Sequence, residues 1–253
     1  MKKYLFTCIA ATALWLTACD PKEDREDLPS PAYTSATLKY SVTQQTGYDN
    51  RVMLENKTPG VIPYWDYVVG VSNKQKDTIV LPFAGSFFIK FYAYTKGGPV
   101  EDSTKITVTN NDPTYFHNPT WNQLTDGVTG RTWVWAADVP TGFCFGNGSG
   151  AALTPEWWQV PASQLGDAVA DEMTFDLNGA YNYSITHNGV TSKGLFALDT
   201  TLQTLKFTGA DISKGNGVTY NIAKINDNEL TIVQQGDGWR DLWLFKRKGY
   251  VYQ

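Results

Sequence analysis

Between residues 114 and 253 the chain repeats short alternating segments separated by tight-turn sequences, and this rhythm most limits its possible folds. Each segment alternates apolar and polar side chains, as a strand with one buried face does. Asn178-Gly179 and Asn188-Gly189 separate neighbouring segments, and Asn-Gly is the strongest short signal for a hairpin turn. We therefore predict eight consecutive strands: Arg131–Ala136, Glu172–Leu177, Ala180–Thr186, Lys193–Leu198, Thr204–Thr208, Val218–Ile225, Glu229–Gln235 and Arg240–Arg247.

Sequential antiparallel strands of this kind predict an up-and-down barrel of lipocalin-like type. A β-sandwich is the alternative, because strand order cannot be read from one sequence. The large side chains at inward positions favour a filled interior over a hollow one that would hold a small hydrophobic ligand. These residues are Trp133, Phe175, Tyr181, Tyr183 and Phe207. The fold class is therefore all-β.

Residues 30–110 predict a second, smaller β domain. Short extended segments separated by Pro, Gly and Asn fit an immunoglobulin-like sandwich. The expected segments are Thr37–Gln44, Asn50–Glu55, Tyr64–Val71, Asp77–Leu81, Phe87–Tyr94 and Thr104–Thr109. Asn110-Asn111-Asp112-Pro113 breaks the pattern, so the second domain is expected to span residues 114–253.

The N-terminal sequence predicts where the protein is located in the cell. Residues 1–18 combine a short cationic start with an apolar run that suits a signal peptide but is too short for a membrane-spanning helix. Leu16-Thr17-Ala18-Cys19 resembles a bacterial lipobox, which implies lipidation of Cys19. The strongly charged residues 19–29 predict a solvated tether, and they resemble the acidic export signal of Bacteroidetes lipoproteins. That resemblance implies an outer-membrane lipoprotein that faces the cell exterior.

Composition excludes several function classes. The 21 basic and 25 acidic residues give a net charge of −4, which is unsuited to holding nucleic acid. Two histidines leave little for metal or triad chemistry, so we expect no cofactor and no bound metal, with a structural calcium ion at clustered Asp and Asn left open. Removal of the signal and lipidation of Cys19 leave only Cys144, so no intramolecular disulfide is expected.

Two family resemblances cover most of the mature chain. The N-terminal domain resembles the PKD domain, although Val68-Val69 stands where that family usually has Gly-Asp after the aromatic strand. The motifs are Val52-Met53-Leu54-Glu55-Asn56, Trp65-Asp66-Tyr67, Leu81-Pro82-Phe83-Ala84-Gly85, Phe91-Tyr92-Ala93-Tyr94 and Gly97-Gly98. In such proteins PKD domains generally act as spacers, and Trp65 is expected to be a core residue.

The C-terminal domain resembles a family of Bacteroidetes surface lipoproteins in which a PKD domain precedes it. The resemblance rests on residues 130–135, 145–146, 155–158, 171–176, 193–196, 229–231 and 242–244. Such proteins resemble the glycan-binding components encoded beside SusC/SusD-type uptake systems. This implies a polysaccharide or oligosaccharide partner, with a β-glucan as one candidate, and association with a SusC/SusD-type complex.

Loop parity locates a candidate site. Successive connections of a meander alternate between its two ends, so the long connections 137–171, 187–192, 209–217 and 236–239 share one rim. Sugar rings stack on indoles, while carboxylates and guanidinium groups bind hydroxyls. The candidate ligand-binding residues are Glu156, Trp157, Trp158, Asp237, Trp239 and Arg240. Trp133, Trp135 and Trp243 are expected in the core.

We expect a binding protein rather than an enzyme. A glycoside hydrolase needs two carboxylates across the sugar, and Glu156 and Asp237 could meet on the rim. However, no closely spaced acidic signature, nucleophile elbow or phosphate loop is present. The alternative function is a structural or assembly lipoprotein that contacts a protein partner, in which case the rim should be a flat patch rather than a cleft.

Overall fold

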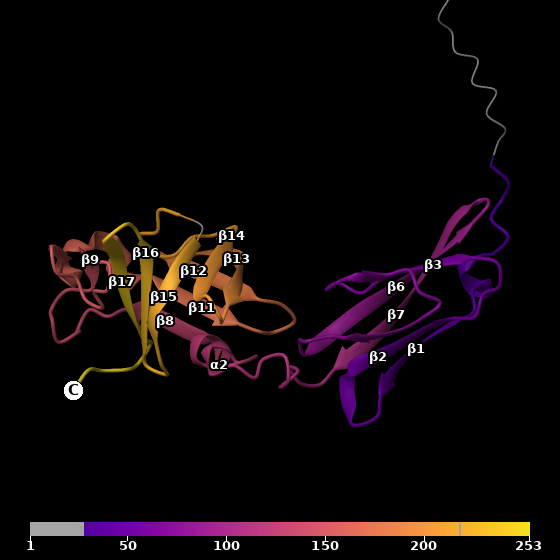
Figure 1. Cartoon of the computed structure of the whole chain (residues 1–253), viewed down its shortest axis with the longest axis horizontal. Coiled ribbons are helices and arrows are strands. Elements are labelled where there is room, and N and C mark those ends of the chain that lie inside the picture. Colours follow the sequence, from indigo (N-terminus) through magenta and orange to yellow (C-terminus); the bar gives the residue numbers. More distant parts are fainter. Residues whose placement is uncertain (1–27, 218) are drawn as a thin grey trace, which may run out of the picture.

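The computed structural model describes residues 28–217 and 219–253, and it confirms the all-β prediction. The predicted signal peptide, Cys19 and the tether up to residue 27 lie outside the described residues. Figure 1 shows an N-terminal sandwich and a C-terminal barrel, joined by a segment that contains the helix α2 (Pro119–Thr125). None of the described helices is both long enough and apolar enough to cross a membrane.

The sandwich packs two antiparallel sheets face to face. One sheet has the order β1-β2-β5 and the other β4-β3-β6-β7. Their bounds are β1 (Tyr40–Gln45), β2 (Tyr48–Asn56), β3 (Ile62–Asp66), β4 (Val71–Ser72), β5 (Lys76–Val80), β6 (Gly85–Thr95) and β7 (Gly98–Val108), after a 3-10 turn η1 (Ser35–Thr37). Trp65 is fully buried between the sheets, and its ring centroid lies 4.4 Å from that of Phe91. It is therefore the core residue that the sequence predicted.

The expected strand Tyr64–Val71 is wrong in its second half. The chain turns between β3 and β4, and Val68 has a φ of 70°, in the left-handed region. A β-branched residue is strained there, and glycine is the residue that fits without strain. The hydrophobic, β-branched pair Val68-Val69 therefore gave a strand signal at a position where the backbone turns.

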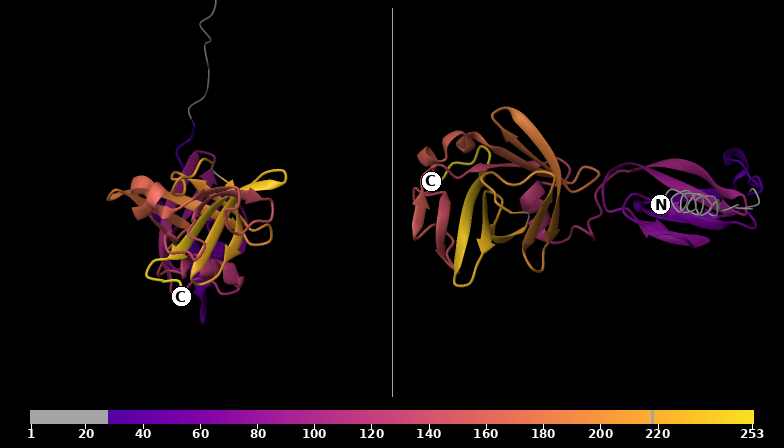
Figure 2. Two further views of the ribbon diagram at one scale, coloured as in Figure 1. Left: turned by 90° about the vertical axis from the view of Figure 1, so that its left-hand side faces the viewer. Right: turned by 90° about the horizontal axis from the view of Figure 1, so that it is seen from above.

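The C-terminal strands close into a barrel. In the described part of the chain, eight strands pair antiparallel in sequence order, and the last strand also pairs with the first. They are β8 (Arg131–Trp135), β11 (Glu172–Asp176), β12 (Asn182–His187), β13 (Val190–Asp199), β14 (Thr204–Thr208), β15 (Thr219–Ile225), β16 (Glu229–Gln235) and β17 (Trp239–Arg247). Figure 2 shows these strands curling around a common interior. The β17–β8 pairing decides for the barrel and against the sandwich alternative.

Two strands were missed in the long connection 137–171. They are β9 (Phe145–Ser149) and β10 (Trp158–Val160), and 3-10 turns η2 (Ala162–Gln164) and η3 (Gly166–Ala170) follow them. The last part of β17, Phe245–Arg247, pairs with β8, whereas its first part, Trp239–Trp243, pairs with β9. The sheet thus divides at β17, and the β9–β10 hairpin extends beside the barrel.

Glycines explain both the hairpin and its absence from the prediction. A Cβ at Gly146 would overlap the carbonyl oxygen of Trp158, and one at Gly148 would lie 2.9 Å from the Ala152 side chain. The bare backbone lets the segment 150–157 fold tightly over this face of β9. Two glycines in five residues also weaken the strand signal in the sequence.

The barrel interior is filled, as predicted. Trp133, Trp135 and Trp243 are almost completely buried. The connection 209–217 closes the rim end, because its backbone accepts hydrogen bonds from interior aromatic side chains. Tyr183 Oη donates to the carbonyl oxygen of Asp211 at 2.9 Å, and Trp243 Nε1 donates to that of Lys214 at 3.2 Å.

The opposite end, expected to hold only tight turns, is covered by α2. Asn118 caps this helix by accepting a hydrogen bond from the backbone N–H of Thr120, and Pro119 occupies its first turn. An Asn-Pro pair in this place is a recognisable helix start that the sequence prediction passed over. Trp133 Nε1 donates to the Leu124 carbonyl oxygen at 2.9 Å, which ties the helix to the barrel interior.

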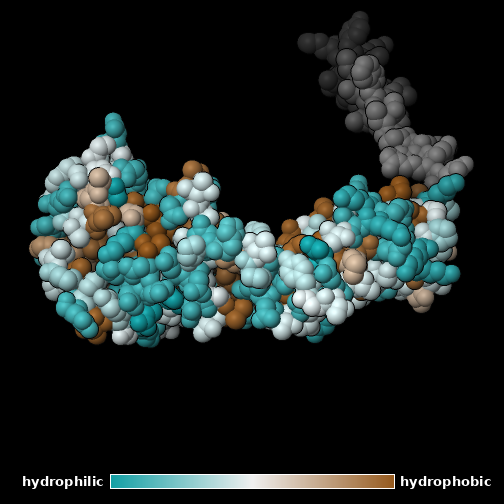
Figure 3. All heavy atoms as spheres, turned by 60° about the horizontal axis from the view of Figure 1, so that its bottom comes forward, coloured by the Kyte–Doolittle hydropathy of each residue, from teal (hydrophilic) through white to brown (hydrophobic). Residues whose placement is uncertain are grey.

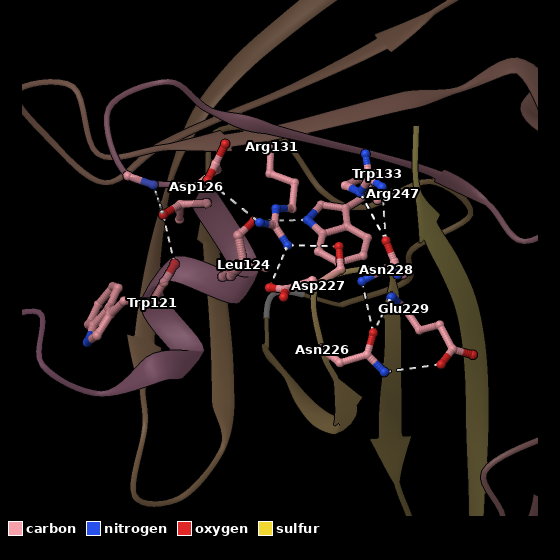
Figure 4. Close-up of polar contacts among 12 residues, drawn as sticks. Trp121, Leu124, Asp126, Arg131, Trp133, Asn226, Asp227, Asn228, Glu229 and Arg247 are labelled. Carbon is pink, nitrogen blue, oxygen red and sulfur yellow. Dashed lines mark hydrogen bonds and ion pairs between the residues drawn. The ribbon is translucent and has the colours of Figure 1, made fainter. Parts of the chain in front are cut away.

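Arg131 fastens the helix end to a barrel turn (Figure 4). Its side chain is only 9% exposed, and Nη1 donates to the Asp227 carbonyl oxygen at 2.9 Å. Nη2 lies 3.7 Å from Asp126 Oδ1. The guanidinium also lies 5.9 Å from the centre of the Trp133 ring. This buried cation is therefore held by backbone, carboxylates and an aromatic face.

Aromatic side chains join the sandwich to the barrel. The Phe83 ring of the sandwich lies 4.7 Å from Tyr181 and 5.5 Å from Phe116. Tyr181 in turn stacks on Trp121 of α2 at 5.4 Å, so Trp121 is a junction residue. Figure 3 shows two lobes with a narrower connection between them.

Candidate functional site

Three tryptophans stand out because they are exposed, whereas every other described tryptophan is buried. Trp157 is 63% exposed, Trp158 51% and Trp239 42%. All three belong to the extension formed by β9, β10 and the beginning of β17. In Figure 1 this extension lies at the end of the barrel far from the sandwich.

Strand register places two of these indoles on one face. Trp158 is opposite Asn147, and Asn147 is opposite Asp241. Directly opposed residues share a face, and so do residues two apart in one strand, so Trp239 lies on the same face as Asp241. We call this face the tryptophan shelf, and it consists of Phe145, Asn147, Trp158, Trp239 and Asp241.

The barrel core supports the shelf from below. Trp158 contacts Phe145 edge to face, with ring centroids 5.2 Å apart. Phe145 in turn lies 5.4 Å from Trp243 and 5.9 Å from Trp135, both of which are buried. A continuous series of rings thus runs from the interior to the exposed indole. Such packing fixes the ring position before any ligand arrives.

Trp239 rests on a glycine in the β16–β17 turn. A Cβ at Gly236 would overlap the Trp239 indole, so the ring lies directly against the Gly236 backbone. The two residues also form the closing hydrogen bond of the turn, from Gly236 N–H to the Trp239 carbonyl oxygen at 2.9 Å. Glycine at position 236 therefore determines where this indole can lie.

Polar groups lie on the same face beside the two indoles. Within residues 28–217 and 219–253, the structure gives the Asp241 carboxylate no hydrogen bond and no ion pair, and partial burial raises its pKa above the usual aspartate value. Gln234 lies opposite Asp241 on β16. Asn147 Oδ1 accepts a hydrogen bond from the Trp158 backbone N–H at 3.0 Å. The carboxylate and amides are available next to two aromatic surfaces.

Glu156 and Arg240 lie on the other side of these strands. Arg240 alternates with Trp239, so it points away from the shelf, and its Nε donates to the Gly150 carbonyl oxygen at 2.8 Å. Glu156 Oε2 accepts a hydrogen bond from the Ser149 backbone N–H at 3.0 Å, which lowers the pKa of this carboxyl. These two predicted binding residues fasten the segment 150–157 to the strands.

The structure therefore places only some of the six predicted site residues on the shelf. Trp158 and Trp239 share the shelf, while Trp157 precedes β10 and its register with the shelf is not fixed by pairing. Asp237 is exposed in the β16–β17 turn. Asp241 and Asn147 were missed, because the predicted strand began at Arg240 and β9 was not predicted. Period-two alternation from Trp239 would have found Asp241.

A polar network at the rim joins the buried Asp171 and Ser213 to the exposed His187, but the order of its groups is structural. Ser213 Oγ donates to Asp171 Oδ2 at 2.6 Å, and His187 Nδ1 lies 2.6 Å from Asp171 Oδ1. A nucleophilic triad needs the histidine between the hydroxyl and the carboxylate. Here the carboxylate lies between them, and Ser213 Oγ accepts from Trp135 Nε1 at 2.9 Å. The network holds the connection 209–217 against the barrel.

The surface hollows described in residues 28–217 and 219–253 lie elsewhere. One of about 550 Å³ lies beside Arg131 and Arg247 at the α2 end, and another of about 440 Å³ lies beside His187. None of the five described hollows is lined by Trp157, Trp158 or Trp239. Within the same residues, no three His, Cys, Asp or Glu side chains converge to hold a metal ion.

Comparison with known proteins does not assign the chain to a family. No family model matches the chain, and no curated protein matches it. One solved structure, described as "Structural basis for the promiscuous specificity of the carbohydrate-binding modules from the beta-sandwich super family", is 10% identical, with a TM-score of 0.26. The match covers 90% of this chain and 95% of that one. A likeness at this TM-score carries no argument about this chain.

Proposed function

We propose that the protein is a cell-surface lipoprotein that binds a polysaccharide by stacking its sugar rings on the tryptophan shelf. The observation that carries this proposal is the pair of exposed indoles, Trp158 and Trp239, which share one face with the Asp241 carboxylate beside them. Each ring is held in place by the fold rather than by a ligand. The protein acts in glycan capture and uptake and performs no chemistry on the glycan.

The chemistry of a pyranose suits this arrangement. One face of the sugar presents C–H groups that stack on an indole, and its edge presents hydroxyls that donate hydrogen bonds. A rigid tryptophan supplies a large contact area at little cost in conformational entropy. Asp241 can accept from a hydroxyl, and a hydrogen bond to a charged group is about twice as strong as a neutral one.

The proposed location rests on the sequence. A signal peptide over residues 1–18, which ends just before Cys19, and an acidic tether support a lipoprotein on the outer face of the outer membrane. Acyl chains contribute ~0.8 kcal/mol per buried methylene, so a lipidated Cys19 would anchor the chain firmly. We further propose that the sandwich is a PKD-type spacer, and that the protein works with a SusC/SusD-type complex.

A glycosidase function is less well supported by the site. The two carboxylates of such an enzyme flank a single glycosidic bond. Asp241 lies on the shelf, whereas Glu156 lies on the opposite side of β9 and is bonded to the Ser149 backbone. The strands separate these two groups, so they cannot act on one bond from two sides.

Affinity electrophoresis and calorimetry with soluble glucans, xylans and mannans test the proposal. We expect at least one polymer to retard the detergent-solubilised full chain, and Trp158→Ala and Trp239→Ala each to weaken that binding about tenfold or more. Tyr94→Ala is the matched control, because Tyr94 is an exposed aromatic residue on the sandwich. Retention that is equal in wild type and both tryptophan variants would contradict the proposed site.

A protein partner is the second candidate function. One observation favours it: the shelf is not part of any described hollow. A flat patch that contacts a protein would also lie outside the hollows. Exposed tryptophans are also enriched at protein interfaces. If no polysaccharide on the panel binds, this function becomes the better explanation of the shelf.

A further inference from the structure

We infer that the shelf selects uncharged polysaccharides, with one chain lying from Trp158 to Trp239 beside Asp241. This inference rests on the proposed function and names the substrate class of the same site. Asp241 and Asn147 are then specificity-determining residues that the sequence prediction did not include. The argument has three steps, which concern the spacing of the rings, the state of the carboxylate and the charges around it.

The first step is the spacing of the two indoles. Trp158 is two strands away from β17, and Trp239 lies two residues from the position opposite Asn147. With strands ~4.8 Å apart and a rise of ~3.4 Å per residue, the two Cα atoms lie ~12 Å apart. This span exceeds one sugar ring, so the two indoles would contact different units of one chain, and the shelf favours a polymer over a monosaccharide.

The second step is the position of Asp241 beside that path. Its register pairs it with Asn147 on one side and Gln234 on the other, so three polar side chains cross the shelf in one line. Trp158 is in the same row, and Trp239 lies two residues along β17 from Asp241, so a chain that stacks on both indoles passes beside Asn147 and Asp241. Its hydroxyls would then meet an acceptor carboxylate and an amide, which can donate as well as accept.

The third step is the absence of a compensating cation. Arg240, the adjacent residue on β17, faces away and is bonded to the Gly150 carbonyl oxygen. In the described residues no lysine or arginine forms an ion pair with Asp241, and burial raises its pKa. A uronic acid or sulfate group placed on the shelf would meet this uncompensated charge, and like charges in a partly desolvated site repel strongly.

The test compares two forms of the same polymer. A soluble mixed-linkage β-glucan and a glucomannan are each measured by calorimetry in neutral form and after partial oxidation of C6 to the carboxylate. We expect the full chain to bind the neutral form at least tenfold more tightly. In Asp241→Asn, binding of the neutral form should weaken about fivefold, and the preference over the oxidised form should largely disappear.

Glu101→Gln supplies the matched control, since Glu101 is an exposed carboxylate on the sandwich, and it should keep the wild-type preference. Thermal unfolding of Asp241→Asn checks that the near-isosteric change leaves the fold intact. Equal wild-type affinity for both forms, or an unchanged preference in Asp241→Asn, would overturn the inference while leaving the proposed function standing. If Trp158→Ala also fails to affect any glycan binding, the proposed function fails with it.

Discussion

Single residues hold the exposed indole rings in the positions that ligand binding would need. Trp158 is supported by Phe145, whose own contacts reach the buried Trp243 and Trp135. Trp239 lacks such a series, and its ring lies against the backbone of Gly236. The two halves of the shelf therefore depend on different features, an aromatic series for one and a missing side chain for the other.

Gly236→Ala tests the second of these features. The new methyl group would overlap the Trp239 indole, so the ring must move, while the backbone conformation itself remains open to alanine. We expect glycan affinity to fall about tenfold, with little change in thermal stability. Intrinsic fluorescence would report the displaced ring. An affinity equal to that of wild type would show that the ring position over Gly236 is irrelevant.

Cys144 reports on the packing of the barrel core. It is almost fully buried, and burial raises the pKa of its thiol to about 11. The thiolate is the reactive form, so a thiol reagent should label Cys144 only when the protein unfolds. Labelling in urea should follow the unfolding transition, whereas rapid labelling of the native protein at neutral pH would contradict this burial.

At the scale of elements, alternation and turn sequences predicted most strands. The strands that were missed depend on close packing of the backbone, which the sequence does not show. The eight barrel strands follow from apolar alternation and from Asn-Gly turns such as Asn178-Gly179. β9 and β10 were missed, since Gly146 and Gly148 carry no strand signal and matter only through the segment that packs on them. For the same reason only part of the shelf was predicted. Trp158 and Trp239 were candidates from the sequence, but Asn147 and Asp241, which strand pairing brings to the same face, were not.

The connection 209–217 behaves as a closing element of the barrel, and Asp211 organises it. Its carboxylate accepts hydrogen bonds from Tyr220 Oη at 2.8 Å, Ile212 N–H at 2.7 Å and Gly217 N–H at 3.2 Å. Asp211→Ala should therefore lower the free energy of unfolding by about 2–3 kcal/mol, because these donors lose their acceptor in a partly buried site. Urea unfolding measures this loss. Asp211→Asn keeps the shape and part of the acceptor capacity, so its loss should be smaller.

At the scale of the whole molecule, the aromatic junction fixes how the sandwich presents the barrel. Phe83 contacts Tyr181 and Phe116, and Tyr181 Oη donates a hydrogen bond to Tyr115 Oη at 2.8 Å. A firm junction would keep the shelf at the end of the molecule away from the sandwich, as Figure 1 shows. That placement suits the proposed role of the sandwich as a spacer between a lipid anchor and the glycan-binding shelf.

Phe83→Ala tests whether the junction is firm. Loss of the ring removes the contacts that join the two lobes, so small-angle scattering should show a larger or broader distribution of overall dimensions. Glycan affinity in solution should stay the same, because the shelf lies at the far end of the barrel. Unchanged scattering would show that Phe83 does not fix the orientation of the lobes.

The most direct measurement of the central claim is a glycan titration followed through the indole N–H signals in NMR. Single tryptophan variants assign the signals beforehand. With a polymer that the panel identifies as a ligand, the signals of Trp158 and Trp239 should shift together and saturate at the same ligand concentration. Those of Trp65 and Trp133, which lie in the two cores, should stay in place. Saturable binding that leaves the signals of Trp158 and Trp239 unmoved would contradict the account.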